Sequence, residues 1–191
     1  MGQVIFTINS TIEGTAGHEY GIADAELHEF HTEMLQRADV IVFGRNTYRL
    51  MEDFWPTAAK QPGVTDYMLR FAETINSMPK VVISRSLKQV NWHNTTLVNG
   101  DAGAEVKQLK EKYNRIAVGG LQLAASLADL DLIDEYWFLL QPFLVGRQDW
   151  VNGKPPKLFE QLQHTRKLAL IEAKALHSGV VALHYKSVSQ S

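Results

Sequence analysis

The sequence predicts an α/β protein with a mixed, mostly parallel sheet, helices on both faces of the sheet and an antiparallel hairpin near its C-terminal end. Through the first two thirds of the chain, short apolar runs typical of buried strands alternate with segments of helical periodicity. From Ile133 onward, strand patterns follow one another, which is typical of antiparallel pairing. Because no repeat or linker divides the chain, we expect one domain over residues 1–186 and a frayed tail over residues 187–191.

The strands of the alternating region are expected to be short and buried. The run over residues 38–43 is apolar at five of its six positions, as in a strand covered on both faces. Similar runs recur along this region and end in glycine or small polar residues. The expected strands cover residues 4–8, 38–43, 80–83, 95–98 and 115–118.

Helix boundaries follow from capping residues and prolines. Asp24 and Asp101 are suitable N-caps, because a short carboxylate can accept a hydrogen bond from the first free N–H groups of a helix. A helix that begins near Thr47 should end before Pro56, since proline disfavours helical geometry in the residue before it. The expected helices cover residues 24–37, 47–55, 66–76, 101–113 and 121–130, and the last two strands cover residues 168–176 and 180–186.

Composition excludes several classes of function. The 191 residues contain no cysteine, which excludes disulfides, thiolate metal sites and a cysteine nucleophile. A formal net charge of −2 gives no support for a nucleic-acid or anionic-membrane partner, and the histidines lack metal-like spacing, so no metal site is expected. Without a signal-peptide pattern or an apolar run of about 20 residues, the protein is expected to be cytoplasmic.

Three strand ends carry residues that suit phosphate groups. Ligands of such sheets bind beyond the carboxyl ends of the strands, where glycines permit close approach and arginine offers a planar charged fork. A solvated strand-to-helix turn is an equally good interpretation of the first motif taken by itself. The three turns comprise Gly44, Arg45, Asn46 and Thr47; Ser84, Arg85 and Ser86; and Gly119, Gly120, Leu121 and Gln122.

These turns belong to a wider pattern of motifs along almost the whole chain. The chain resembles the dihydrofolate-reductase-like superfamily, and more closely the C-terminal reductase domain of bacterial riboflavin-biosynthesis deaminase-reductases (RibD) and its stand-alone relatives. The resemblance implies the three-layer fold of that superfamily. It rests on seven segments in the family's order: residues 4–14, 43–48, 80–87, 118–120, 132–136, 141–146 and 178–181.

The resemblance implies NADPH as the cofactor, held by the three turns. It also implies a cis peptide bond between Gly119 and Gly120, where the backbone meets the cofactor phosphates. The family is commonly dimeric, so a homodimer is expected. The aromatic residues Tyr136, Trp137, Phe138 and Phe143 suggest an exposed surface for self-association.

The implied reaction is hydride transfer to a C=N or C=O bond of a small nitrogen heterocycle, of the kind catalysed by 5-amino-6-(5-phosphoribosylamino)uracil reductase. Glu13 stands where the riboflavin enzymes have aspartate, so it is the candidate catalytic and substrate-binding residue. A solvated loop carboxylate is the ordinary alternative. The zinc-site motifs of the accompanying deaminase are absent from this chain.

Further substrate-binding candidates are His28, within the expected first helix, and Met51 and Trp55, which follow the Gly44 turn. Dihydrofolate reductases place a carboxylate on the first helix, but an ungapped count back from Gly44 reaches His28, which weakens that alternative function. Met51 and Trp55 are expected to wall the substrate ring, although core packing explains Met51 equally well. A nucleotide-binding module that has lost catalysis is the alternative outside the enzymes.

Overall fold

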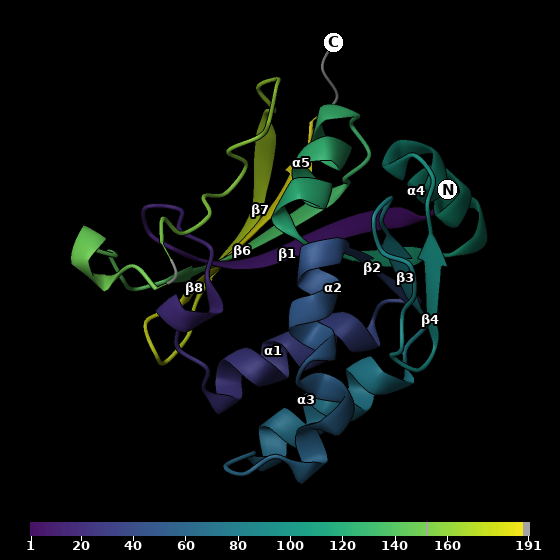
Figure 1. Ribbon diagram of the computed structural model, residues 1–191. Coiled ribbons are helices and arrows are strands. Elements are labelled where there is room, and N and C mark those ends of the chain that lie inside the picture. Colours follow the sequence, from purple (N-terminus) through teal and green to yellow (C-terminus); the bar gives the residue numbers. More distant parts are fainter. Residues whose placement is uncertain (152, 189–191) are drawn as a thin grey trace.

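The computed structural model describes residues 1–151 and 153–188, which form one eight-stranded sheet with helices on both faces (Figure 1). The strand order is β4-β3-β2-β5-β1-β6-β8-β7. The strands are β1 (Gln3–Thr11), β2 (Val40–Gly44), β3 (Lys80–Ile83), β4 (Thr95–Val98), β5 (Arg115–Gly119), β6 (Glu135–Gln141), β7 (Leu168–Ala175) and β8 (Val181–Ser187). The α-helices are α1 (Ala25–Gln36), α2 (Arg45–Glu52), α3 (Asp66–Ser77), α4 (Ala102–Lys112) and α5 (Leu121–Asp129). Short 3₁₀ helices are η1 (His18–Tyr20), η2 (Trp55–Lys60) and η3 (Arg147–Asp149).

The sheet is mixed, as predicted. The strands from β4 to β6 pair in parallel, whereas β8 pairs antiparallel with β6 and β7 pairs antiparallel with β8. Strand β1 lies between β5 and β6 and runs to Thr11, longer than expected, because its parallel pairing with β6 continues from Ile5 opposite Glu135 to Thr11 opposite Gln141. This extension carries the polar residues after Ile8 to the carboxyl end of the sheet.

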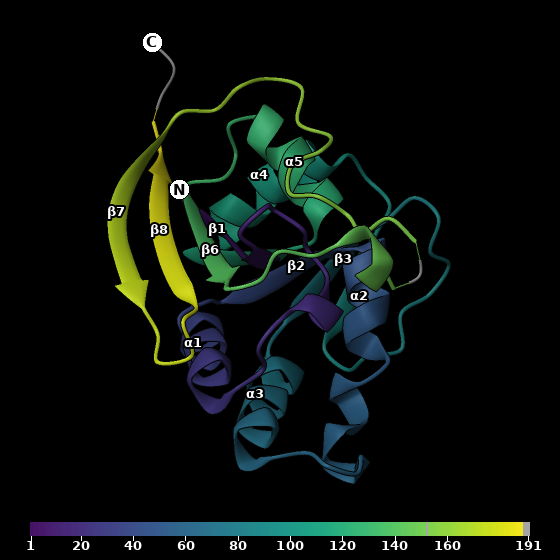
Figure 2. The ribbon, with the colours of Figure 1, turned by 90° about the vertical axis from the view of Figure 1, so that its left-hand side faces the viewer.

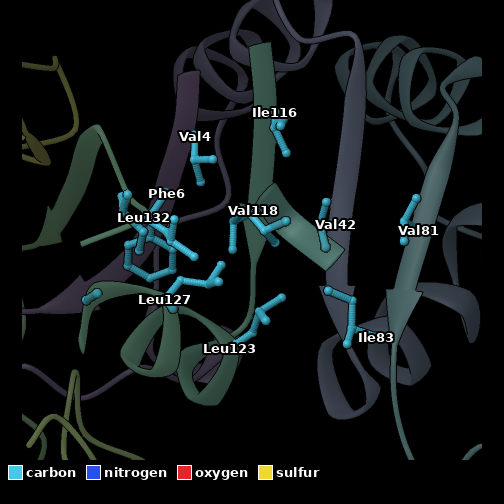
Figure 3. Close-up of a cluster of buried hydrophobic side chains, with 14 of the residues drawn as sticks. Val4, Phe6, Val42, Val81, Ile83, Ile116, Val118, Leu123, Leu127 and Leu132 are labelled. Atoms are coloured by element: carbon cyan, nitrogen blue, oxygen red, sulfur yellow. The ribbon is translucent and has the colours of Figure 1, made fainter. Parts of the chain in front are cut away.

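Helices α4 and α5 cover one face of the sheet, and α1 and α3 cover the other (Figure 2). Successive side chains of β2 point to opposite faces of the sheet, so that Val42 packs toward α5 and Phe43 packs toward α3. Figure 3 shows Val42 and Val118 in one cluster with Leu123 and Leu127 of α5. Because Leu127 is fully buried, its truncation to alanine should cost about 2–5 kcal/mol of stability.

Helix caps agree with the sequence at two positions and differ at one. The carboxylates of Asp24 and Asp101 accept hydrogen bonds from the N–H groups of Leu27 and Ala104, at 2.8 and 3.0 Å. Helix α2, however, begins at Arg45 rather than near Thr47, because Gly44 itself occupies the N-cap position. The positively polarised end of α2 therefore lies directly at the strand end.

The expected aromatic association surface and the expected tail are both wrong in part. Tyr136 is buried, and Trp137 stacks on the His184 ring at 4.0 Å, because β6 is an inner strand between β1 and β8. Phe143, beyond the end of β6, is exposed.

Ser187 belongs to β8 and its N–H donates to the Asp134 carbonyl, whereas residues 189–191 lie outside the described part of the chain. Across the described residues, no helix is long and apolar enough to cross a membrane.

Candidate functional site

Two adjoining pockets lie at the carboxyl ends of the parallel strands. The first, here called the polar pocket, is formed by the Gly44–Thr47 turn, by the first turn of α5 and by the segment 156–161. The second, the apolar pocket, has a volume of about 300 Å³ and lies between the sheet and helices α1, α2 and α3. The linings of the two pockets share Thr47, Leu50, Gly120 and Leu121, so the pockets lie side by side.

Arg45 connects the polar pocket to the serine-rich turn after β3. Its Nη1 donates a hydrogen bond to the Ser86 hydroxyl at 2.8 Å, and its Nε donates to the Asn46 side-chain oxygen at 3.2 Å. The guanidinium is exposed and forms no ion pair with a carboxylate in the described structure. It is therefore held in place with its charge still available to an anion.

The other residues of the serine-rich turn lie outside both pockets. The Ser84 hydroxyl is buried and accepts hydrogen bonds from the backbone N–H groups of Ser86 and Leu87, at 3.3 and 3.1 Å. It thus shapes the turn that presents Ser86 to Arg45. Arg85 is exposed. The cofactor contacts predicted for Ser84, Arg85 and Ser86 stay predictions.

The paired glycines form the wall between the two pockets. The expected cis peptide bond is wrong, because all peptide bonds of the described residues are trans. The chain instead turns at Gly120 with φ at +120°, a conformation that side chains other than glycine rarely adopt. A Cβ atom at Gly120 would stand 2.9 Å from the Thr47 hydroxyl, and one at Gly119 would stand 3.0 Å from the Phe43 ring. Glycine is favoured at both positions because the Thr47 side chain and the Phe43 ring already occupy the space that a Cβ atom would take.

His31 and Asn9 are the polar pair of the apolar pocket. His31 Nε2 lies 3.0 Å from Asn9 Oδ1, which joins α1 to the end of β1. Burial, with a smaller contribution from the charge of His28, lowers the pKa of His31 to about 4. The imidazole is therefore neutral at physiological pH. Most of the remaining lining is apolar, including Met34, Phe43 and Ile75.

Of the predicted substrate-binding residues, His28 lies on α1, Met51 on α2 and Trp55 at the start of η2, because α2 ends at Glu52 and not at residue 55. Met51 lines the apolar pocket, as expected of a wall residue. His28 and Trp55 do not line it; the His28 ring lies 5.0 Å from Tyr67, and the Trp55 ring lies 4.5 Å from Phe71, which does. His28 and Trp55 thus support the pocket from behind, and their predicted contacts with substrate stay untested.

His31 was not among the residues predicted to bind substrate, because histidines on an amphipathic helix usually lie at its surface or boundary. His31 stands almost one helical turn after His28, so an ungapped count back from Gly44 passes His31 before it reaches His28. The available signal was the spacing of three residues, which places both histidines near one helix face without showing which of them reaches the ligand. The position of Asn9 directly after the five-residue strand pattern of residues 4–8 was a second signal.

Glu13 lies in the turn after β1, outside the lining of both pockets. Its Oε1 accepts a hydrogen bond from the Val145 N–H at 3.2 Å and lies 3.9 Å from Lys157 Nζ. Burial acts to raise the pKa of Glu13, but hydrogen bonds, led by that of the Thr11 side chain, outweigh it and lower the pKa to about 2. An ionised, engaged carboxylate holds the 142–146 loop and is poorly suited to donate a proton. Its catalytic role stays a prediction.

The chain matches the RibD C-terminal domain family over residues 3–182 and belongs to this family of NAD(P)H-dependent reductases. This match confirms the resemblance found in the motifs. The chain is also 25% identical over 182 residues to the uncharacterized protein YyaP of Bacillus subtilis (strain 168), across 94% of this chain and 89% of YyaP.

Solved structures confirm the dihydrofolate-reductase-like fold. A Shewanella sp. PV-4 protein named for riboflavin biosynthesis superposes with a TM-score of 0.71 at 20% identity, over 98% of this chain and 99% of that one. A pyrimidine reductase-like protein from Corynebacterium diphtheriae gives 0.65 at 13% identity, over 99% and 93% of the two chains. RibD of Acinetobacter baumannii also gives 0.65 at 13% identity, but the match spans 59% of its longer chain and 99% of this one.

Proposed function

We propose that the protein is an NADPH-dependent reductase that transfers hydride to a C=N or C=O bond of a small nitrogen heterocycle of the aminouracil class. The observation that carries this proposal is that the two pockets adjoin and share Thr47 and Gly120 in their linings. A dinucleotide needs a polar site for its phosphates next to a flat apolar site for its reacting ring. The polar pocket and the apolar pocket have these two properties and lie next to each other.

The residues of the polar pocket fit the phosphate-bearing half of NADPH. Arg45 supplies a positive charge that has no carboxylate partner among the described residues, and Lys157, which lies 3.9 Å from the Glu13 carboxylate, supplies a second cation. The first turns of α2 and α5 supply free backbone N–H groups. The lack of a Cβ atom at Gly120 lets Thr47 pack closely against the backbone at the start of α5. Arg45, held against Ser86, would bind the additional phosphate that distinguishes NADPH from NADH.

The apolar pocket orients the reacting rings. When bound, NADPH supplies the hydride, and the protein aligns donor and acceptor. Phe43, Met51 and Phe71 give flat or flexible apolar contacts and exclude water. The His31 and Asn9 pair provides the hydrogen-bonding edge that fixes the orientation of a heterocycle.

Dihydrofolate reduction is not supported by the pocket. No aspartate or glutamate lies in its lining as described, so the carboxylate that grips a pterin in such enzymes has no counterpart. The neutral imidazole of His31 cannot supply the same negative charge at physiological pH.

The proposal is tested by rapid mixing of the NADPH complex with a panel of aminouracils and with dihydrofolate, while NADPH absorbance is recorded. We expect oxidation of NADPH with at least one aminouracil and none with dihydrofolate. A protein that binds NADPH tightly and oxidises none of it with any member of the panel would be a nucleotide-binding module, and the proposal would be wrong.

A further inference from the structure

The two pockets differ sharply in charge. Arg45, Lys157 and Glu160 line the polar pocket, where Glu160 is paired with Lys154 at 2.8 Å, whereas the described lining of the apolar pocket contains no arginine, lysine, aspartate or glutamate. A phosphate group is stabilised in proteins by arginine, lysine or free backbone N–H groups, and its desolvation without them is costly. The backbone N–H groups near Gly120 lie on the shared wall, next to the polar pocket. A phosphate group on the substrate would therefore find no cation in the apolar pocket.

His18, at the edge of the apolar pocket, does not change this conclusion. Its Nδ1 lies 3.3 Å from a carboxylate oxygen of Glu19, so any positive charge on His18 is already paired. The side chain is 74% exposed, and water screens its charge further. An anion at this edge would also face the Glu19 carboxylate.

His31 gives the pocket one defined hydrogen-bonding group. Asn9 Oδ1 can only accept, so the hydrogen of the neutral imidazole lies on Nε2 and Nδ1 has a free lone pair. Within the described structure, Nδ1 has no hydrogen-bond partner. The nearest titratable neighbour on α1 is His28, whose Nδ1 is hydrogen-bonded to the Asp24 carbonyl at 2.9 Å. His28 therefore does not compete with a ligand for His31 Nδ1. A neutral acceptor on an apolar wall matches the ring N–H of an uncharged lactam-type heterocycle.

We infer that the substrate enters the apolar pocket as an uncharged planar heterocycle without a phosphate group, and that a ring N–H donates a hydrogen bond to His31 Nδ1. The inference rests on the proposed function, since that function assigns the polar pocket to the cofactor. It separates this protein from reductases of phosphorylated aminouracils and makes the dephosphorylated compounds its substrate class.

The first test compares two ligands that differ by one phosphate. The protein saturated with NADP⁺ is titrated by calorimetry with 5-amino-6-(ribosylamino)uracil and with its 5′-phosphate. We expect the phosphate to weaken binding by about tenfold or more, because it gains no cation in the pocket. Equal or tighter binding of the phosphorylated compound would overturn the inference.

The second test addresses His31. Wild-type protein should bind uracil about three- to tenfold more tightly than 1,3-dimethyluracil, which has no ring N–H. His31→Phe should abolish this preference, and His31→Gln should keep part of it through its amide oxygen. The control His93→Phe, at an exposed histidine outside both pockets, should keep the preference in full. Thermal unfolding of each variant establishes that it is folded.

The outcomes separate the two proposals. If NADP⁺ binds but the ligand preferences are equal or reversed, or if no uracil binds, the substrate inference fails while the cofactor assignment stands. If NADP⁺ does not bind, the proposed reductase function fails, and the same titrations on the cofactor-free protein still decide between the ligands. Persistence of the uracil preference in His31→Phe would overturn the role of His31.

Discussion

The Arg45 guanidinium donates a hydrogen bond to the Ser86 hydroxyl across 2.8 Å, although the two residues lie 41 positions apart in the sequence. The contact holds the turn after β2 against the turn after β3 and fixes one orientation of the charged group. Ser86→Ala should leave Arg45 mobile and weaken NADPH binding by roughly two- to tenfold, with little change for NADH. Fluorescence titration with both cofactors measures this. Loss of NADH affinity to the same extent would show that Ser86 acts only on the fold.

Gly120→Ala should destabilise the protein, because the added Cβ atom would crowd Thr47 in the wall that the two pockets share. The positive φ and the 2.9 Å approach to the Thr47 hydroxyl predict a loss of about 1–3 kcal/mol in the free energy of unfolding. Gly44→Ala is the matched control, because Gly44 has φ at −78° and the nearest atom to its added Cβ stands at 3.6 Å. Urea unfolding of the two variants should differ accordingly, and equal stability would contradict this account of the turn.

Protonation of His31 should lower stability in mildly acidic solution. Its pKa is about 4 in the folded protein and about 6.5 in the unfolded chain, so the unfolded chain binds the proton first as pH falls. The contribution is therefore fully present above pH 6.5 and is lost between about pH 6.5 and 4. The free energy of unfolding of wild type should fall more steeply over this range than that of His31→Phe. The exposed control His93→Gln should match wild type, and parallel curves for all three would refute the shift.

Glu13→Gln should retain most of the reductase activity. The carboxylate lies outside both pockets and binds the Val145 N–H, an interaction that a glutamine oxygen can replace. We expect less than a threefold change in kcat, with a lower melting temperature from the loss of charge near Lys157. A fall in kcat of a hundredfold or more, with the fold intact, would restore Glu13 as the proton donor.

A homodimer is expected to form through the edge strand β7. Leu170 and Ile171 are 56% and 50% exposed there, and antiparallel pairing about Ala173 would set Glu172 opposite Lys174 of a second copy. Light scattering should give twice the mass of the chain, and Leu170→Lys should shift it to the monomer. Leu130→Lys, at a similarly exposed leucine elsewhere, is the control. A monomeric wild type, or dissociation by Leu130→Lys as well, would exclude this interface.

Sequence reasoning was most successful where the governing interactions are local. Asp24 and Asp101 cap their helices through contacts within three residues, and the apolar run through Val42 specifies a strand covered on both faces. The turns of the polar pocket were also found, because parallel strands bring their carboxyl ends to the same edge of the sheet.

The errors arose where tertiary packing decides. The rotation of α1 about its axis, relative to the sheet, places His31 rather than His28 in the lining of the apolar pocket. No local sequence pattern determines that rotation. Tyr136 is buried because β8 pairs with β6, a long-range contact that the apolar run does not reveal. The trans peptide at Gly120 and the engagement of Glu13 with Val145 likewise depend on segments that are distant in the sequence or on backbone geometry.

The measurement that tests the central claim most directly is the affinity of Arg45→Ala for NADPH and for NADH, determined by fluorescence titration. Arg49→Ala, an exposed arginine one turn along α2 and outside both pockets, is the control. We predict that Arg45→Ala weakens NADPH by about tenfold or more and NADH by less than threefold, because one charge-assisted contact to the extra phosphate is lost. An equal loss for both cofactors, or no loss for either, would contradict the assignment of the polar pocket to NADPH.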